Sequence, residues 1–326
     1  MQEHLIPVYD DPKIVEFADK QLHIFWTHNE IKVEKDIQDV LTNFSEAEKH
    51  AVLTVLKLFS LYETNIGDEY WGGRFKEVFK SADYHRMASV FAMFELAVHA
   101  PFYNKINELL YVNTPEFYLS YKDTEVLKDR MEFIGKAIDD EDDLVSVGAF
   151  SMVEGAVLYS SFAYLKHYQS QGKNKLMNVV RGLNFSTRDE GLHQEASAYA
   201  FKKAVKDRKL TEEQKQVLAD KLKTIAEKIY QHESQINALL FAKGSVEGVT
   251  EHQLNCFTKS RLNACMLDLG FDSVYEVTYN PISSWFYKGI NDYQFNDFFS
   301  GGGNQYHRNW DETAFVWKKN VVNVNQ

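Results

Sequence analysis

Cysteine is nearly absent from this chain of 326 residues, which excludes a fold built on disulfides. The two cysteines, Cys256 and Cys265, lie nine residues apart in one helical pattern. Nine residues of helix span about 13 Å, which is too far for a disulfide between them. We therefore expect both to be reduced core residues of a cytoplasmic protein.

Basic residues are also in short supply. The chain has 36 lysines and arginines against 47 aspartates and glutamates, a net charge of -11. This balance argues against a broad nucleic-acid surface, so we expect no nucleic-acid partner. No basic-then-apolar leader opens the chain, which favours a cytoplasmic location over secretion.

Proline and strand patterns are scarce as well. There are five prolines, and the 16 glycines cluster at expected helix ends and near the C-terminus. Such punctuation is typical of a mainly helical protein. We predict one all-α domain over residues 1–299. After it, the segment 300–304 (SGGGN) is expected to act as a flexible hinge that leads into a flexible C-terminal tail, residues 300–326.

Helix start and stop signals locate the expected elements. Capping boxes begin helices at Ser45, Thr211 and Thr250. The predicted helices cover 12–20, 45–67, 84–111, a short segment from 114, 123–138, 143–169, 173–205, 211–244 and 250–270.

Six residues of metal-ligand type stand in otherwise apolar helical stretches: Glu63, Glu95, His99, Glu154, Glu190 and His193. Glu154 is the only charge within residues 144–165, a run long enough to resemble a membrane span. Its central acid and the acids of other helices favour a buried bundle helix, so we expect no membrane. A lone buried carboxylate costs several kcal/mol or takes up a proton, so several of them suggest a shared cation.

The spacing of these residues sharpens the expectation. Glu190 and His193 are three apart, on one helix face. Four carboxylates and two histidines on four helices match the ferritin-like di-metal carboxylate bundle, and they suit iron or manganese better than zinc or calcium. For any one of them alone, the alternative is a core polar group satisfied by an ion pair or by water.

One spacing departs from that pattern, because Glu95 and His99 are four apart. Pro101 removes a backbone donor and crowds the preceding turn. We predict a π-bulge or kink between Glu95 and Pro101 that aims both side chains inward. The alternative is that a four-residue spacing in a regular helix is close enough.

Longer motifs then point to one family. Arg188-Asp-Glu-Gly-Leu-His193 matches the pattern RDExxH. Other matching segments, in chain order, are Phe25-Trp26 with Glu30-Ile-Lys-Val-Glu-Lys, Leu61-Tyr-Glu63-Thr-Asn-Ile-Gly67, Glu154 with Tyr159 and Phe162, residues 261–271, and Asn280-Pro-Ile-Ser-Ser-Trp285. Together they resemble the small, radical-generating subunit of class I ribonucleotide reductase, over about residues 24–310. The fold this implies is a ferritin-like helical bundle with extra helices.

The resemblance implies a cofactor of two metal ions, with iron the first expectation and Mn/Fe or Mn/Mn as alternatives. Glu63 stands where the family usually has Asp, and its longer side chain would change the geometry of the site and with it the metal preference. Manganese would imply a flavodoxin-like activator protein. In the family the site generates a stable radical, and the radical tyrosine corresponds to Tyr103, with Tyr159 in reserve.

The resemblance also implies a route out of the site and two kinds of partner. The radical would leave through His99, Asp189 and Trp26 by proton-coupled electron transfer. A tail tyrosine, Tyr306 or else Tyr293, would bridge to the large catalytic subunit, where ribonucleotides are reduced. Residues 317–326 would dock on that subunit, although this tail is basic and polar where many family tails are acidic. Family members are homodimers.

Two other classes of function remain as alternatives. A different ferritin-like di-metal oxidase, such as a desaturase, would share the ligands but not need Trp26, Asp189 or the tail. An iron-storage protein would usually be shorter and lack the large C-terminal extension. A purely structural helical protein would not leave Glu154 uncompensated in an apolar helix.

Overall fold

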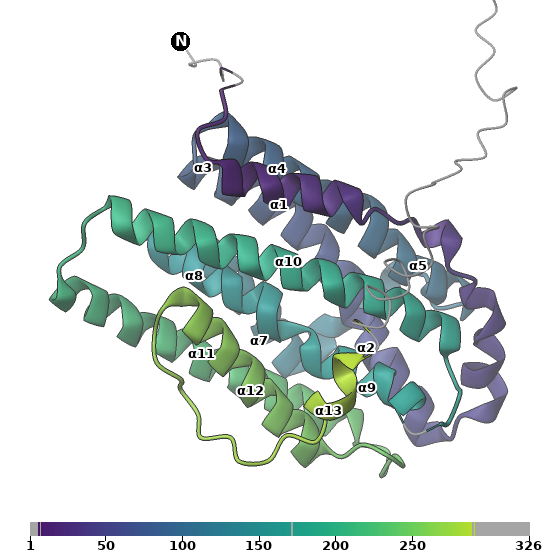
Figure 1. The fold of residues 1–326 in the computed structure, drawn as a ribbon. Helices are drawn as coiled ribbons and strands as arrows, with labels where there is room; N and C mark the ends of the chain where they lie inside the picture. Colours follow the sequence, from purple (N-terminus) through teal and green to yellow (C-terminus); the bar gives the residue numbers. More distant parts are fainter. Residues whose placement is uncertain (1–5, 7, 171, 289, 291–326) are drawn as a thin grey trace, which may run out of the picture. The chain divides into compact units, whose positions relative to one another are not determined.

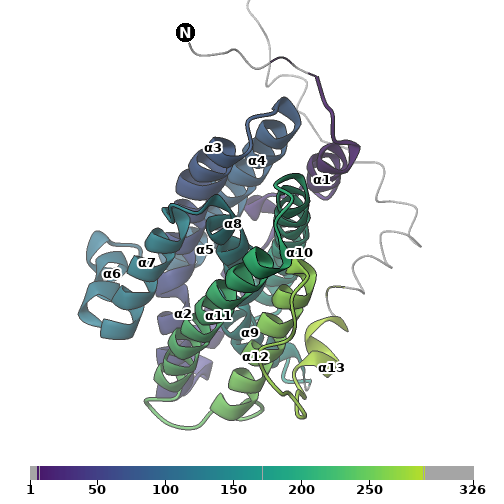
Figure 2. The same cartoon turned by 90° about the vertical axis from the view of Figure 1, so that its left-hand side faces the viewer.

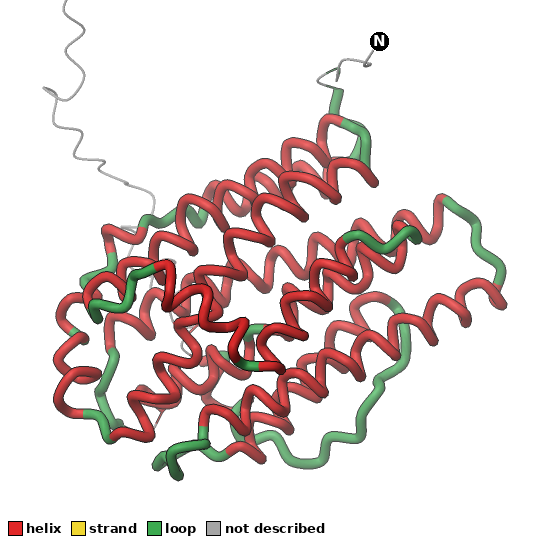
Figure 3. Tube along the Cα trace, turned by 180° about the vertical axis from the view of Figure 1, so that it is seen from behind, coloured by secondary structure: helices red, strands yellow, loops and turns green. Residues whose placement is uncertain are grey.

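The described part of the chain is mainly α-helical. The computed structural model describes residues 6, 8–170, 172–288 and 290, and no strand occurs among them (Figure 3). The α-helices are α1 (Pro12–His23), α2 (Glu46–Asn65), α3 (Phe75–Val78), α4 (Ala82–Phe94), α5 (Ala100–Leu109), α6 (Pro115–Leu119), α7 (Glu125–Ile138), α8 (Asp143–Met152), α9 (Tyr159–Ser170), α10 (Met177–Asp207), α11 (Glu212–Leu240), α12 (Glu251–Leu269) and α13 (Ser283–Phe286). The all-α prediction is confirmed.

The predicted helix starts are confirmed at the three capping boxes. Ser45, Thr211 and Thr250 each accept a hydrogen bond from the backbone three residues on, and the Glu or Gln there returns one. These bonds satisfy amide donors that the first turn of a helix leaves unpaired. At the other end of α12, Gly270 adopts a φ of 92°, a left-handed conformation that glycine takes without steric cost.

Several helical segments are not α-helical. The π-helices are η3 (Asp39–Asn43), η4 (Ile66–Arg74), η5 (Glu95–His99) and η7 (Val153–Val157); the 3₁₀ turns are η1 (His28–Glu30), η2 (Val33–Lys35) and η6 (Ser120–Asp123). The π-bulge predicted at Glu95 is confirmed by η5, which ends two residues before Pro101. The expected helix end at Gly67 was wrong, because the chain continues there as η4 to Arg74.

The long helix α10 and the helix α2 carry candidate ligands and pack against different neighbours. Helix α10 packs against α8, α9 and α12 (Figures 1 and 2) and against η7, while α2 packs against α5, α11 and η5. The stretch Asp143–Ser170 is long and apolar enough to cross a membrane by length and composition, yet its apolar window is entirely buried inside the structure. The prediction of a buried bundle helix is confirmed.

The cysteines differ from one another. Cys265 is fully buried, as expected, but Cys256 is only partly buried, so the prediction of two core cysteines was wrong for it. Both thiols are free.

The predicted hinge and tail, residues 300–326, lie outside the described residues, as do Tyr293 and Tyr306.

Candidate di-metal site

Four helical segments bring the six candidate ligands together. These residues are at most 4% exposed, and they come from α2, η5, η7 and α10. They form two overlapping clusters, in each of which the potential ligand atoms all lie within 4.8 Å of one another. The clusters are Glu63, Glu95, His99 and Glu190, and Glu95, Glu154, Glu190 and His193.

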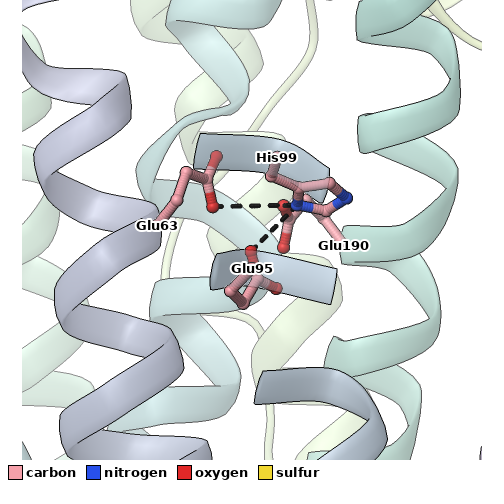
Figure 4. Close-up of side chains that lie close together, drawn as sticks. All are labelled: Glu63, Glu95, His99 and Glu190. Carbon is pink, nitrogen blue, oxygen red and sulfur yellow. Dashed lines mark hydrogen bonds and ion pairs between the residues drawn. The ribbon is translucent and has the colours of Figure 1, made fainter. Parts of the chain in front are cut away.

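In the first cluster the carboxylates converge on one nitrogen of His99 (Figure 4). Its Nδ1 lies 2.9 Å from Glu95 Oε2, 3.2 Å from Glu190 Oε1 and 3.8 Å from Glu63 Oε2. The π-helix places Glu95 and His99 side by side despite their four-residue spacing. Nδ1 is therefore the atom of His99 that faces the carboxylates.

The second cluster surrounds Nδ1 of His193. This atom lies 2.7 Å from Glu95 Oε1, 3.6 Å from Glu190 Oε2 and 3.7 Å from Glu154 Oε2. Glu95 and Glu190 thus direct one oxygen to each histidine. A carboxylate shared in this way can bridge two cations.

Burial and mutual repulsion set the charge of the cluster. Burial, reinforced by neighbouring carboxylates, raises the pKa of Glu63 and of Glu154 well above the usual value. Burial opposes ionisation of Glu95 too, but the two histidines outweigh it and lower the pKa of Glu95. Burial likewise acts against the charged histidines, yet Glu95 raises the pKa of both His99 and His193 well above the usual value. In the metal-free chain, protons bound to these carboxylates and histidines therefore balance the charge that metal cations would otherwise balance.

The donor set fits two metal ions. Glu63 Oε1 and His193 Nε2 are buried without a hydrogen-bond partner, and Glu95 Oε1, Glu190 Oε1 and His193 Nδ1 lie within ion-pair distance of a neighbour but make no hydrogen bond. Buried polar atoms of this kind are rare in folded proteins unless a further ligand completes them. Carboxylate and imidazole ligands suit iron or manganese.

A hydrogen-bonded chain leads away from the first cluster. His99 Nε2 lies 3.2 Å from Asp189 Oδ2, and the indole Nε1 of Trp26 donates to the same oxygen at 2.7 Å. Although burial opposes it, the hydrogen bond with His99 holds the pKa of Asp189 below its usual value. Arg188 ties the N-terminal segment to α10 by donating to the carbonyl of Ile24 at 2.8 Å. The structure thus joins the three residues named for radical exit.

Tyr103 lies in α5, one turn after His99, and is fully buried. Its hydroxyl hydrogen-bonds with Ser186 Oγ at 2.9 Å, and its ring packs on Phe59 with centroids 4.6 Å apart. Burial, together with the charge of Glu63, raises the pKa of Tyr103 well above the usual value. The reserve residue Tyr159 is buried too, but the guanidinium of Arg261 lies over its ring at 4.1 Å.

Two neighbours of the site were missed from the sequence. Trp71 donates its Nε1 proton to Glu154 Oε1 at 2.8 Å, and Ser186 contacts Tyr103. Trp71 lies in η4, where a regular helix was expected to have ended. Ser186 lies four residues before Glu190 on α10, and that spacing is the only sign that it would share a face with the site.

The fold and the buried cluster define a ferritin-like helical protein with a site that can hold two metal ions. Comparison with known proteins narrows the class. Residues 6–281 match the sequence family described as ribonucleotide reductase, small chain. The chain therefore belongs to the ribonucleotide reductase small-chain family, as the motifs predicted. Membership makes it an oxidoreductase subunit and implies a large-subunit partner and a dimer.

Individual relatives are distant in sequence. A protein of Invertebrate iridescent virus 3, named probable ribonucleoside-diphosphate reductase small subunit 048L, is 23% identical over 295 residues, which are 84% of this chain and 76% of that protein. The ribonucleoside-diphosphate reductase small chain of Plasmodium falciparum is 25% identical over 62% of this chain and 57% of its own.

Solved structures show the same fold at low identity. The dimanganese(II)-NrdF structure of Streptococcus sanguinis has a TM-score of 0.76 at 22% identity, covering 89% of this chain and 99% of that one. The ribonucleotide reductase R2 subunit of Clostridium botulinum has a TM-score of 0.73 at 19% identity, covering 86% of this chain and 89% of that one. These likenesses confirm the ferritin-like fold.

Proposed function

We propose that this chain is the radical-generating small subunit of a class I ribonucleoside-diphosphate reductase. The observation that carries the proposal is the buried chain from His99 through Asp189 to Trp26, which begins at the di-metal cluster. A storage protein or a self-contained oxidase has no need of such an exit. The movement of electrons and protons follows from the residues along it.

The six clustered residues, Glu63, Glu95, His99, Glu154, Glu190 and His193, would hold the metal pair. Bound iron or manganese, once oxidised by an external oxidant, would supply the oxidising power. We propose iron as the first metal, with Mn/Fe and Mn/Mn as alternatives, and two manganese ions are the pair named for the Streptococcus sanguinis protein. Manganese would bring in the flavodoxin-like activator.

Tyr103 is the proposed radical residue. Because its pKa is raised well above the usual value, the phenol keeps its proton at neutral pH. Oxidation must therefore remove a proton together with the electron. Ser186 Oγ, at 2.9 Å, orients the hydroxyl and is the first group the proton meets. The buried aromatic surroundings keep water away from the oxidised ring.

Asp189 is the proposed link of the exit route. It accepts hydrogen bonds from Trp26 and His99 at the same oxygen, Oδ2, so a proton on either ring can shift as the charge on the other changes. A carboxylate on the second nitrogen of a metal-binding histidine also fixes the orientation of that ring. Trp26 therefore couples to the cluster through Asp189, and its ring also lies against that of His99, with centroids 5.9 Å apart.

Beyond Trp26 the proposal rests on the family resemblance. Tyr306, with Tyr293 as second choice, would carry the radical toward the large catalytic subunit, and residues 317–326 would dock there. The small subunit would act as a cytoplasmic homodimer. The domain division proposed is 1–299 for the helical bundle and 300–326 for the tail.

The experiment is a low-temperature EPR spectrum of the full chain after aerobic loading with ferrous iron, with Tyr103→Phe and Tyr159→Phe alongside. We expect an organic radical in the parent and in Tyr159→Phe, and none in Tyr103→Phe. A radical that persists in Tyr103→Phe would contradict the assignment of the tyrosine. A parent without a radical would be reloaded with manganese and an activator, and silence there too would contradict radical generation.

Deletion of residues 304–326 tests the tail. We expect the deletion variant to bind metal and form the radical as the parent does, because the cluster lies in α2, η5, η7 and α10. Nucleotide reduction with the large subunit should be lost. Activity that survives the deletion would contradict the role of the tail.

A further inference from the structure

The π-helix η7, which carries Glu154, receives two arginine side chains from outside. A turn at Leu158 separates η7 from α9, so the regular backbone ladder of this long apolar stretch is interrupted there. Interruptions of this kind leave backbone carbonyls that need other donors. Arg130 donates to the carbonyl of Val157 at 2.7 Å, and Arg261 to the carbonyl of Gly155 at 2.8 Å.

Arg130 reaches η7 from α7 and is 1% exposed. Its charge is balanced by Glu233 of α11, with Nη2 and Oε1 2.7 Å apart. Ser160 donates to the other oxygen of Glu233 at 2.9 Å. The guanidinium also lies over the ring of Tyr62, 4.6 Å from its centroid. Arg130 therefore contacts both η7 and α2. Its contact in α2 is Tyr62, the residue just before the candidate ligand Glu63.

Arg261 reaches η7 from α12, which follows η7 in the sequence, whereas α7 precedes it. Besides its bond to Gly155, it donates to Tyr287 Oη at 3.0 Å and covers the ring of Tyr159. Close packing keeps α12 against η7, since a Cβ on Gly155 would lie only 2.4 Å from Cys265 Sγ. Only glycine leaves room for this approach.

We propose that Arg130 and Arg261 are positioning residues that hold Glu154 at the second cluster by binding the carbonyls of η7. The two carbonyls lie one and three residues after Glu154, on the segment whose helical register departs from α. The hydrogen bond from Trp71 orients the Glu154 carboxylate, whereas the arginines fix the backbone from which it projects. The inference rests on the proposed di-metal function.

The proposal predicts a selective effect on one ion. Glu154 belongs only to the cluster around His193, while the cluster around His99 does not include it. Loss of either arginine should therefore lower the affinity for the ion of the Glu154 cluster by about 10- to 100-fold. This is the usual effect of removing a group that supports a metal ligand. The other ion should be affected less, because the backbone carbonyls that these arginines bind lie in η7.

The test is an anaerobic titration of the metal-free full chain with Mn(II), following free Mn(II) by EPR. Arg261→Met removes one donor. Arg130→Met with Glu233→Leu removes the other without leaving a buried charge unpaired, so the variant can fold. Glu154→Gln identifies which of the two ions belongs to its cluster. Arg261→Lys, which keeps a donor, should bind that ion more tightly than Arg261→Met.

Lys166→Met is the matched control. Lys166 is also a buried basic side chain, and it donates to a backbone carbonyl, that of Phe286, at 2.9 Å, but in α13 rather than in η7. We expect this control to bind both ions as the parent does. Thermal unfolding of every variant separates a loss of fold from a loss of metal.

Each outcome has a defined meaning. Selective loss of the Glu154 ion in both arginine variants supports the proposal. The proposal would be overturned if the arginine variants bound both ions as the parent does. It would also be overturned if the affinity for both ions fell equally, and by the same amount in Lys166→Met. Either result would leave the proposed function in place. A parent that binds no pair of ions would overturn the proposed function and this inference with it.

Discussion

Replacing Glu154 by glutamine should stabilise the metal-free protein and destroy its response to metal. Glu154 is buried at 4% exposure, and burial and the charge of Glu190 raise its pKa well above 4.5. The native state therefore keeps a proton that the unfolded chain has lost. Stability of the parent must fall as the pH rises from 4.5 toward the native pKa. Glutamine has the same shape and does not titrate.

The size of the effect follows from the pH interval. Between the unfolded and the native pKa of Glu154, each pH unit removes about 1.4 kcal/mol of stability. A rise from about pH 5.5 to 7.5 therefore costs the parent up to about 3 kcal/mol. Metal-free Glu154→Gln should escape that loss, and its advantage over the parent should grow with pH. Gln Oε1 can still accept the hydrogen bond that Trp71 donates to Glu154 Oε1.

With metal bound, the parent should become more stable than Glu154→Gln. An ion that binds only the native state adds about 4 kcal/mol at a thousand times its dissociation constant. The parent should gain this from each of two ions, and Glu154→Gln from the ion at the other cluster alone. Urea unfolding at about pH 5.5 and 7.5, with chelator and with excess Mn(II), measures both effects.

Glu195→Gln serves as the control, because Glu195 lies on α10 but is exposed. It should match the parent under all four conditions. The reasoning would be refuted if metal-free Glu154→Gln were no more stable than the parent at the higher pH. Equal stabilisation of both proteins by Mn(II) would refute the placement of Glu154 at a metal.

Two further predictions concern the radical and its exit. Asp189→Asn removes the charge that holds His99 and Trp26 together, so nucleotide reduction with the large subunit should fall by at least about tenfold while the EPR radical stays; unchanged reduction would contradict the route. Ser186→Ala removes the only hydrogen-bond partner that the structure gives the Tyr103 hydroxyl within the described residues, so the radical's EPR hyperfine pattern and decay rate should change; an identical spectrum and lifetime would contradict that contact.

The elements themselves were largely predictable, because their signals are local. Capping at Ser45, Thr211 and Thr250 depends on residues three positions apart, and the structure confirms each start. The candidate ligands stood out because a charge inside an apolar helix must be compensated. Pro101 likewise predicted the π-helix at Glu95, since proline removes a local backbone donor.

The contacts between helices were not predictable from spacing. Trp71 lies in a π-helix, whose altered register redirects every side chain that follows, so its bond to Glu154 could not be foreseen. No local pattern marked Arg130 or Arg261 as a partner of the segment that carries Glu154. Only packing shows that both end on carbonyls of η7.

The chain by itself therefore settled which residues form helices and which carboxylates and histidines needed a shared partner, because both depend on neighbours within a few positions. The tertiary structure decided how those groups pair. Glu95 and Glu190 each face both histidines, and Trp26 meets Asp189 across 163 residues of chain. Such contacts depend on how helices cross and where their registers shift, which no local pattern encodes.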